Sequence, residues 1–218
     1  MKITEVYKKY KITKSLQEHH LRVAAVAKQI CDNLTVPVDA KTIIEACLLH
    51  DMGNIIKFDL DKNPKWLEPE GKDYWKTVQT EFKKKYGDNE HQASIEIAKE
   101  LGASQDVLKC IGAIGFNKAV QNSKSNDLEA KLCDYADTRV SPHGVVRILE
   151  RLTEGQQRYK DRSDKWILPG MWEELSSACY KIEEQVFANS RIKPSDITDE
   201  SVAPIIEQLK TYEITETR

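Results

Sequence analysis

A histidine and an aspartate stand side by side at the end of an apolar run, in the stretch LLHDMGN at residues 48–54. His50 follows Cys47 by three residues and Ile43 by seven, so it lies on the apolar face of the helix that this run predicts. Imidazole nitrogen and carboxylate oxygen together suit zinc, iron, manganese or cobalt. The doublet of His50 and Asp51 therefore indicates part of a divalent metal site.

Other histidines also lie on apolar helical faces. His19 shares its face with Val23 and Ile30, whereas His20 follows a neighbouring row, so His19 is predicted to be the inward one. His91 begins a further apolar face. A histidine on such a face is most often a hydrogen-bonded core residue, and spacing alone leaves that interpretation open beside metal binding.

An aspartate occupies an apolar row in the stretch AKLCDYADTRVSPHG. Asp137 lies four residues beyond Cys133, where burial of a carboxylate costs several kcal/mol unless a cation meets it. A divalent ion would meet it and would also lower the pKa of a bound water, giving a hydroxide for attack on phosphorus. Arg139 or Arg147 would meet it equally well, so both interpretations stay open.

The elements that must position these residues are predicted to be helices. A capping box of Ser15 and Glu18 opens a helix over about 16–32, and a helix over about 40–51 ends at Gly53 in a left-handed cap. Further helices are expected over about 74–87, from a cap at Asp88 to Gly102, and over about 104–114, 127–137, 143–159, 172–186 and 202–209. The charged stretch at 144–162 is predicted to be one long helix, on which Arg151 and Glu154 can form an i,i+3 ion pair. Residues 57–71 are predicted to form a loop or lid. No β-type alternation persists, so the fold class is all-α.

Composition limits the classes of protein and partner. The chain has 218 residues, of which 40% are hydrophobic and 31% charged, as in folded globular proteins. We expect one domain over residues 1–218, with a core at about 15–142 and a C-terminal helical extension at about 143–218. The net charge of -2 gives no reason to expect nucleic acid or an anionic membrane as partner. The sequence lacks a signal peptide and any run of about 20 apolar residues, so a cytoplasmic protein is expected.

Three of these stretches together resemble the HD-domain superfamily, the metal-dependent phosphohydrolases named for their His-Asp doublet. HHLRVAAVA resembles the early H-x-x-R-V-A pattern, LLHDMGN the H-D-x-G pattern, and DYADTRVSP the distant aspartate. The resemblance favours His19 over His20, because only His19 places Arg22 at the fourth position. It implies an HD-like helical bundle, and a divalent ion (Mn, Co, Fe, Ni, Zn or Mg) bound by His19, His50, Asp51 and Asp137.

Two departures from the family pattern affect the expected chemistry. His91 resembles the additional histidine of two-metal members, but Phe116 and Asn117 stand where a completing histidine is expected. We therefore predict one tightly held ion, with His91 as a phosphate contact or a weak second-site ligand. Asn54 stands where some nucleotidase members carry a glutamate, and an amide cannot take a proton at neutral pH. Asp51, or hydroxide formed by the metal, is the predicted base.

Phosphate oxygens need cationic partners, and Arg22, Lys57 and Arg139 are the nearest candidates. A structural ion pair is the alternative role for both arginines. The resemblance implies a hydrolase that cleaves a phosphoester of a nucleotide or another small phosphorylated metabolite through a metal-activated water. Two other functions stay open: a non-catalytic metal- or nucleotide-binding domain, and a di-iron HD-type oxygenase. The apolar stripe over 172–186 either closes the core or forms a homodimer contact.

Overall fold

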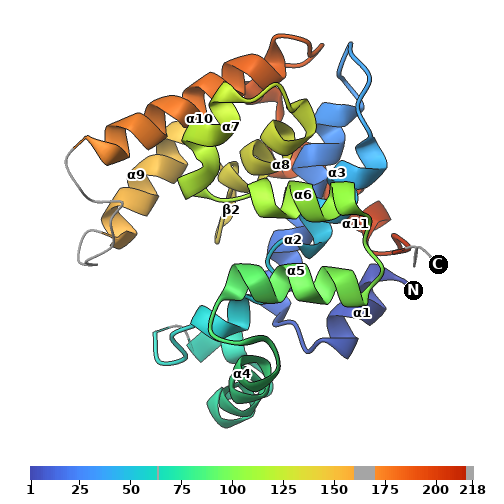
Figure 1. The fold of residues 1–218 in the computed structure, drawn as a ribbon, viewed down its shortest axis with the longest axis vertical. Coiled ribbons are helices and arrows are strands. Elements are labelled where there is room, and N and C mark those ends of the chain that lie inside the picture. Colours follow the sequence, from blue (N-terminus) through green and yellow to red (C-terminus); the bar gives the residue numbers. More distant parts are fainter. Residues whose placement is uncertain (63, 160–169, 215–218) are drawn as a thin grey trace.

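The computed structural model describes residues 1–62, 64–159 and 170–214 and confirms the predicted all-α class (Figure 1). The α-helices are α1 (Ile3–Lys9), α2 (Lys14–Cys31), α3 (Ala40–Leu49), α4 (Lys72–Tyr86), α5 (Glu90–Glu100), α6 (Gln105–Ala113), α7 (Ala119–Lys124), α8 (Leu128–Thr138), α9 (Ile148–Tyr159), α10 (Met171–Phe187) and α11 (Asp199–Leu209). Shorter 3-10 turns are η1 (Asn54–Lys57), η2 (Pro64–Leu67), η3 (Phe116–Lys118) and η5 (Pro194–Asp196). A hairpin of β1 (Val140–Ser141) and β2 (Gly144–Val145) follows α8.

Helix α2 lies at the centre of the fold. It packs against α3, α8 and α11, and its residues 23–27, VAAVA, are fully buried. A helix that is buried around most of its circumference must be apolar on several faces, and three of these five residues are alanines, which allow close approach of neighbouring helices. The N-terminal half of α2, which carries the predicted histidine ligand, is thereby held in a fixed position.

Helix caps correct two of the predictions. The cap of α2 is Thr13, whose hydroxyl accepts the N–H of Leu16, so the expected capping box at Ser15 is wrong. The cap of α5 is Asn89, which accepts the N–H of Gln92, and Asp88 is not the cap. Thr13 and Asn89 have the same capping chemistry as the predicted residues and lie one or two positions away.

The prediction of a left-handed cap at Gly53 is wrong, and the structure requires glycine there because of close packing. Its φ of -88° is ordinary for any residue. A Cβ added there would instead collide with the backbone oxygen of Glu90 and lie 2.6 Å from the Cβ of Ala93. Gly53 therefore allows the first turn of α5 to approach the backbone directly after the His-Asp doublet.

Several other predicted helix boundaries agree with the structure. Some elements of the structure were not predicted. Helices begin after Ser104 and Asp127 and α4 ends before Gly87, as expected. Helices α1 and α7 were missed, and the hairpin occupies part of the predicted helix over 143–159, so that α9 begins only at Ile148. The continuation of the long charged helix expected up to residue 162 lies outside the described residues beyond 159.

The C-terminal segment, defined here as the described residues from 143 onward, covers two sides of the fold. Helix α10 packs against α7 and α8 through the predicted stripe, in which Leu175, Cys179, Ile182 and Val186 are buried. Helix α11 packs against α2 (Figure 1). No helix in the described ranges has both the length and the apolarity that a bilayer crossing requires.

Candidate metal centre

His50 is fixed at the C-terminal end of α3. Its side chain is only 2% exposed, and its Nδ1 lies 2.8 Å from the backbone oxygen of Cys47, one turn earlier. That contact favours the proton on Nδ1, so Nε2 carries the lone pair whenever the ring is neutral. Nε2 lies 3.4 Å from Asp137 Oδ1 and 3.7 Å from Asp51 Oδ2, and it has no hydrogen-bond partner among the described residues.

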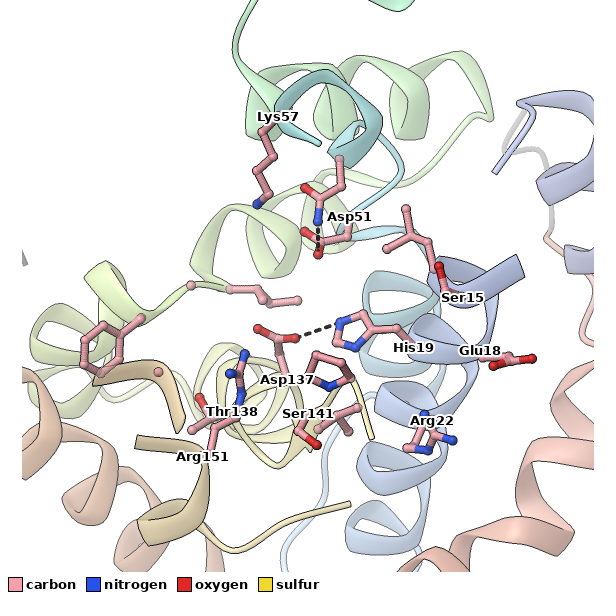
Figure 2. A pocket seen from close by; sticks show the side chains of 18 of the residues that line it. Ser15, Glu18, His19, Arg22, Asp51, Lys57, Asp137, Thr138, Ser141 and Arg151 are labelled. Carbon is pink, nitrogen blue, oxygen red and sulfur yellow. Dashed lines mark hydrogen bonds and ion pairs between the residues drawn. The ribbon is translucent and has the colours of Figure 1, made fainter. Parts of the chain in front are cut away.

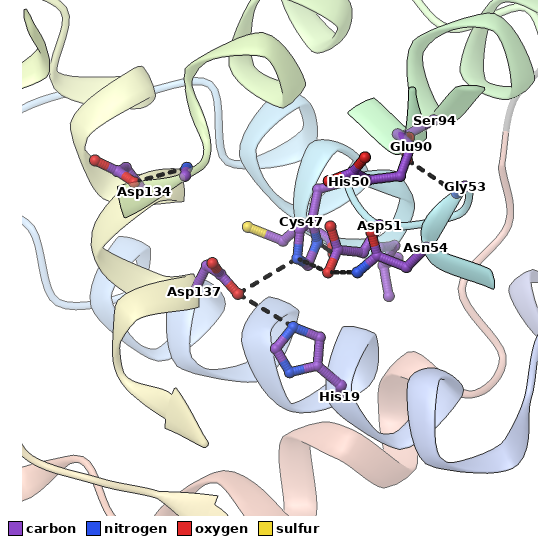
Figure 3. A network of polar contacts seen from close by, with 12 residues as sticks. His19, Cys47, His50, Asp51, Gly53, Asn54, Glu90, Ser94, Asp134 and Asp137 are labelled. Atoms are coloured by element: carbon purple, nitrogen blue, oxygen red, sulfur yellow. Dashed lines mark hydrogen bonds and ion pairs between the residues drawn. The ribbon is translucent and has the colours of Figure 1, made fainter. Parts of the chain in front are cut away.

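Helices α2 and α8 and the residue after His50 bring the remaining groups to His50 Nε2 (Figure 3). His19 comes from α2 and Asp137 from α8, with His19 Nε2 at 3.1 Å from Asp137 Oδ1. Asp51 follows α3 directly, and its Oδ2 accepts a hydrogen bond from the amide nitrogen of Asn54. Ligand atoms of His19, His50 and Asp51 all lie within 4.8 Å of one another.

This donor set fits a divalent metal ion. Two imidazole nitrogens and a carboxylate converge, with the Asp137 carboxylate against both rings, and the buried Nε2 of His50 is left for a further partner. The ring of His50 is oriented by a backbone carbonyl and the carboxylate of Asp51 by an amide, which is how proteins orient metal ligands.

The charges in the cluster act on one another strongly. Burial lowers the pKa of His50, but the carboxylates of Asp51 and Asp137 outweigh burial and raise it to about 9. Burial raises the pKa of Asp137, and the two histidines outweigh that effect and hold it well below its usual range. The carboxylates therefore create a negative field that a proton or a cation would neutralise.

His20 lies in the core, and the prediction that His19 is the more inward of the pair is wrong. His20 is fully buried between the rings of Tyr7 and His50, with centroids 5.4 and 5.2 Å away. Its two ring nitrogens have no hydrogen-bond partner among the described residues. Burial and the neighbouring histidines lower its pKa well below the ordinary value. His19, by contrast, is partly exposed and faces a cavity.

A cavity of about 620 Å³ opens beside the cluster (Figure 2). Its volume is in the range of small-molecule sites. Its wall includes His19, Asp51, Asn54 and Asp137, the cationic side chains of Lys14, Arg22, Lys57, Lys65 and Arg151, and the aromatic side chains of Phe58, Trp66, Phe116 and Trp172. A site with two carboxylates at the histidine cluster and cations around them suits a metal ion together with an anionic ligand.

Three of the four predicted phosphate contacts line this cavity. Arg22 Nε lies 3.3 Å from Asp199 Oδ1 on α11, and Lys57 Nζ lies 3.4 Å from Glu90 Oε1. His91 is exposed at the cavity wall. Both Arg22 and Lys57 thus combine an ion pair with a position at the cavity.

Arg139 is not at the cavity, and its prediction as a phosphate contact is corrected. Its side chain is buried, and its guanidinium donates to the backbone oxygens of Val146, Pro194 and Ile197 and to the hydroxyl of Tyr135. These bonds join α8 to the hairpin and to η5. Arg139 therefore has a structural role, through hydrogen bonds to carbonyls and a hydroxyl and not through the ion pair that was its predicted alternative.

The comparison with protein families gives the same assignment as the geometry. The model described as HD domain matches residues 16–139, which is more than half of the chain. This chain belongs to the HD domain family. The resemblance seen in the three motifs is thereby confirmed. HD domains bind divalent metal ions and are usually hydrolases, and His19, His50 and Asp51 form a cluster whose geometry could hold such an ion. The comparisons with curated proteins and with solved structures found no match.

The HD match ends at Arg139, so part of the cavity wall lies beyond it. Arg151 on α9 lines the cavity, although sequence reasoning assigned it only to surface ion pairs. Its Nη1 donates to Glu154 at 2.8 Å, as the i,i+3 spacing predicted, and its Nε has no hydrogen-bond partner among the described residues. The sequence signal that could have singled it out, a cation on the inner face of α9, was hidden by that pairing.

Proposed function

We propose that this HD-domain protein is a metal-dependent phosphohydrolase that cleaves a phosphoester of a nucleotide or another small phosphorylated metabolite. The observation that carries the proposal is His50 Nε2, which is buried, has no hydrogen-bond partner among the described residues, and faces two carboxylates. Those carboxylates line a cavity with cationic walls. A cation and a phosphate group together match this distribution of charge.

His19, His50, Asp51 and Asp137 are the proposed ligands of one divalent ion. When bound, such an ion lowers the pKa of a water toward neutrality and polarises a phosphoryl oxygen. Asn54 holds one oxygen of Asp51 by a hydrogen bond, which fixes the orientation of the carboxylate. Asp51 is the proposed acceptor for the proton of the attacking water, because the amide of Asn54 cannot take it.

The phosphate is proposed to lie between cations from different elements. Figure 2 shows Lys57 and Arg151 on opposite sides of the Asp51 and Asp137 carboxylates. Arginine can donate two parallel N–H bonds to phosphate oxygens, and Arg151 and Arg22 both line the cavity. His91 is the further proposed phosphate contact. These groups would stabilise the negative charge that develops on the phosphoryl oxygens.

Phosphate release tests the proposal directly. Nucleoside mono-, di- and triphosphates and sugar phosphates are incubated with the protein and Mn²⁺, Co²⁺ or Mg²⁺. We expect metal-dependent release that falls at least about 100-fold in Asp51→Ala, which removes both a ligand and the proposed base. The matched control is Asp88→Ala, which removes an exposed carboxylate outside the cavity and should keep the wild-type rate.

The opposite outcomes identify the alternatives. If a folded wild type that holds its metal releases phosphate from no substrate, the proposal is wrong. Nucleotide binding without turnover would then support a non-catalytic binding domain. A mixed-valent di-iron signal in the spectrum would support the oxygenase, although Phe116 and Asn117 occupy the cavity wall where a second-site histidine is expected.

A further inference from the structure

Two aromatic rings from distant parts of the chain meet at the cavity. Phe116 lies in η3, within the HD match, and Trp172 lies in the first turn of α10, beyond it. Their ring centroids are 4.9 Å apart with an interplanar angle of 49°. Both rings are partly exposed and both line the same cavity as Asp51 and Asp137. The pair therefore offers an aromatic surface beside the candidate metal centre.

The turn that carries Phe116 is held by a buried carboxylate. Asp134 on α8 is 2% exposed and accepts the Gly115 N–H at 3.0 Å and the Asn122 side-chain amide at 2.8 Å. Gly115 has a φ of +143°, a conformation that favours glycine, and a Cβ there would lie 3.0 Å from Asn117 Oδ1. The turn is thus tied on both sides, which places Phe116 before any ligand enters.

Helix α9 approaches Trp172 at Gly155. Gly155 is buried, lines the cavity and lies close enough to the indole that an added Cβ would be 3.4 Å from its Cη2. That distance is an ordinary van der Waals contact, so the Gly155 backbone lies beside the indole. Arg151 is one turn earlier on the same face of α9. The Arg151 guanidinium, which could bind a phosphate, and the Trp172 ring beside Gly155 are therefore about one helical turn apart.

We propose that Trp172, supported by Phe116, selects phosphate esters whose alcohol portion carries a planar aromatic ring, as nucleoside phosphates do and sugar phosphates do not. The ring of the substrate stacks on the indole while its phosphate lies toward Arg151 and the metal cluster. This inference rests on the proposed function and assigns specificity to a residue beyond the HD match. A second aromatic pair, Phe58 and Trp66, also lines the cavity, but its centroids are 6.5 Å apart and Trp66 is 38% exposed on the 57–71 loop.

The test compares esters that share a ribose 5-phosphate unit and differ at C1, which carries an aromatic base in the nucleotides and a hydroxyl in ribose 5-phosphate. The kcat/KM for each of the four ribonucleoside 5′-monophosphates is divided by the kcat/KM for ribose 5-phosphate, at one metal concentration. We expect this ratio to exceed about 10 in the wild type for at least one nucleotide, and to fall about 10-fold or more in Trp172→Leu. Ribose 5-phosphate hydrolysis should stay within about twofold of wild type. Trp172→Phe, which keeps a stacking ring, should retain most of the ratio.

Tyr180→Leu is the matched control, because Tyr180 is an exposed ring on the same helix outside the cavity. It should leave the ratio unchanged. Thermal unfolding of each variant verifies that it is folded. A wild-type ratio near one, or a ratio that Trp172→Leu leaves unchanged, overturns the proposal while the phosphohydrolase function stands. A ratio that collapses in Trp66→Leu and not in Trp172→Leu overturns it in favour of the loop pair.

Failure of the function is distinguishable from failure of this inference. If neither ester is hydrolysed, the proposed function fails, and titration calorimetry with the same ligands decides the inference. Tighter binding of a nucleoside monophosphate than of ribose 5-phosphate, lost in Trp172→Leu and kept in Tyr180→Leu, would support recognition of the ring. Equal binding of the two ligands would overturn it.

Discussion

The HD-matched segment and the C-terminal segment contribute different kinds of residue to one cavity. The HD segment supplies His19, His50, Asp51 and Asp137, which interact within 4 Å across three helices and are recognisable from short sequence patterns. The C-terminal segment supplies Arg151 and Trp172, which come from ordinary amphipathic helices. The difference teaches that the groups proposed for chemistry and those proposed for substrate choice come from separate parts of the chain.

Removing His50 should have the largest effect and should not change substrate preference. His50→Ala removes the buried Nε2 at the centre of the cluster, so metal content measured by mass spectrometry and phosphate release should both fall by more than about 100-fold. All substrates should be affected equally, in contrast to Trp172→Leu. His143→Ala, an exposed histidine outside the cavity, is the control. If His50→Ala retained its metal, His50 would not be a required ligand, and the comparison of the two segments would lose the metal centre on which it rests.

Substitution of Arg151 should affect activity, whereas substitution of Arg139 should affect stability. Arg151→Ala should lower kcat/KM by about 100-fold with little change in the free energy of unfolding, because the guanidinium lines the cavity and is partly exposed. Arg139→Ala should instead lower the free energy of unfolding by about 3 kcal/mol, since it leaves the buried carbonyl of Ile197 and the buried hydroxyl of Tyr135 without their donor.

Urea unfolding measures the free energy of unfolding of both variants, and steady-state kinetics measure their kcat/KM. If Arg139→Ala stays as stable as wild type but loses activity, its assigned structural role is wrong. If Arg151→Ala keeps full activity, the C-terminal segment contributes no phosphate contact at that position.

The pH dependence of stability tests the buried carboxylate of Asp134, which holds the turn before Phe116 within the HD-matched segment. Burial raises the pKa of Asp134 to about 7, against the opposing N–H groups of Asn122 and Gly115. The folded protein therefore keeps a proton that the unfolded chain releases, and the free energy of unfolding falls as pH rises between about 4 and 7. Asp134→Asn removes this ionisation.

The advantage of wild type over Asp134→Asn should thus shrink by about 1 to 2 kcal/mol between about pH 5 and pH 6.5. Urea unfolding of both proteins at the two pH values measures it. Parallel pH profiles would show that Asp134 does not titrate in this window, and that the turn before Phe116 is held by a carboxylate with an ordinary pKa.

Sequence patterns predicted the helices well where the determining contacts are local. Ser104 and Asp127 cap their helices, and Gly87, with a φ of +83°, ends α4. Each of these depends on a side chain or a backbone angle within one helical turn. The caps at Ser15 and Asp88 failed because a neighbouring Thr13 or Asn89 has similar propensity, and only the path of the chain before the helix decides between them.

The sequence by itself determined the all-α class, the order of the three HD motifs and the residue types of the candidate metal centre, because helical periodicity and motif spacing are properties of single segments. Only the tertiary structure decided between neighbours such as His19 and His20, whose side chains leave the helix about a quarter turn apart, one into the cavity and one into the core. It also placed Arg139 in the core and Arg151 at the wall of the cavity. Those outcomes depend on which distant helix packs against each residue, and no local pattern records that contact.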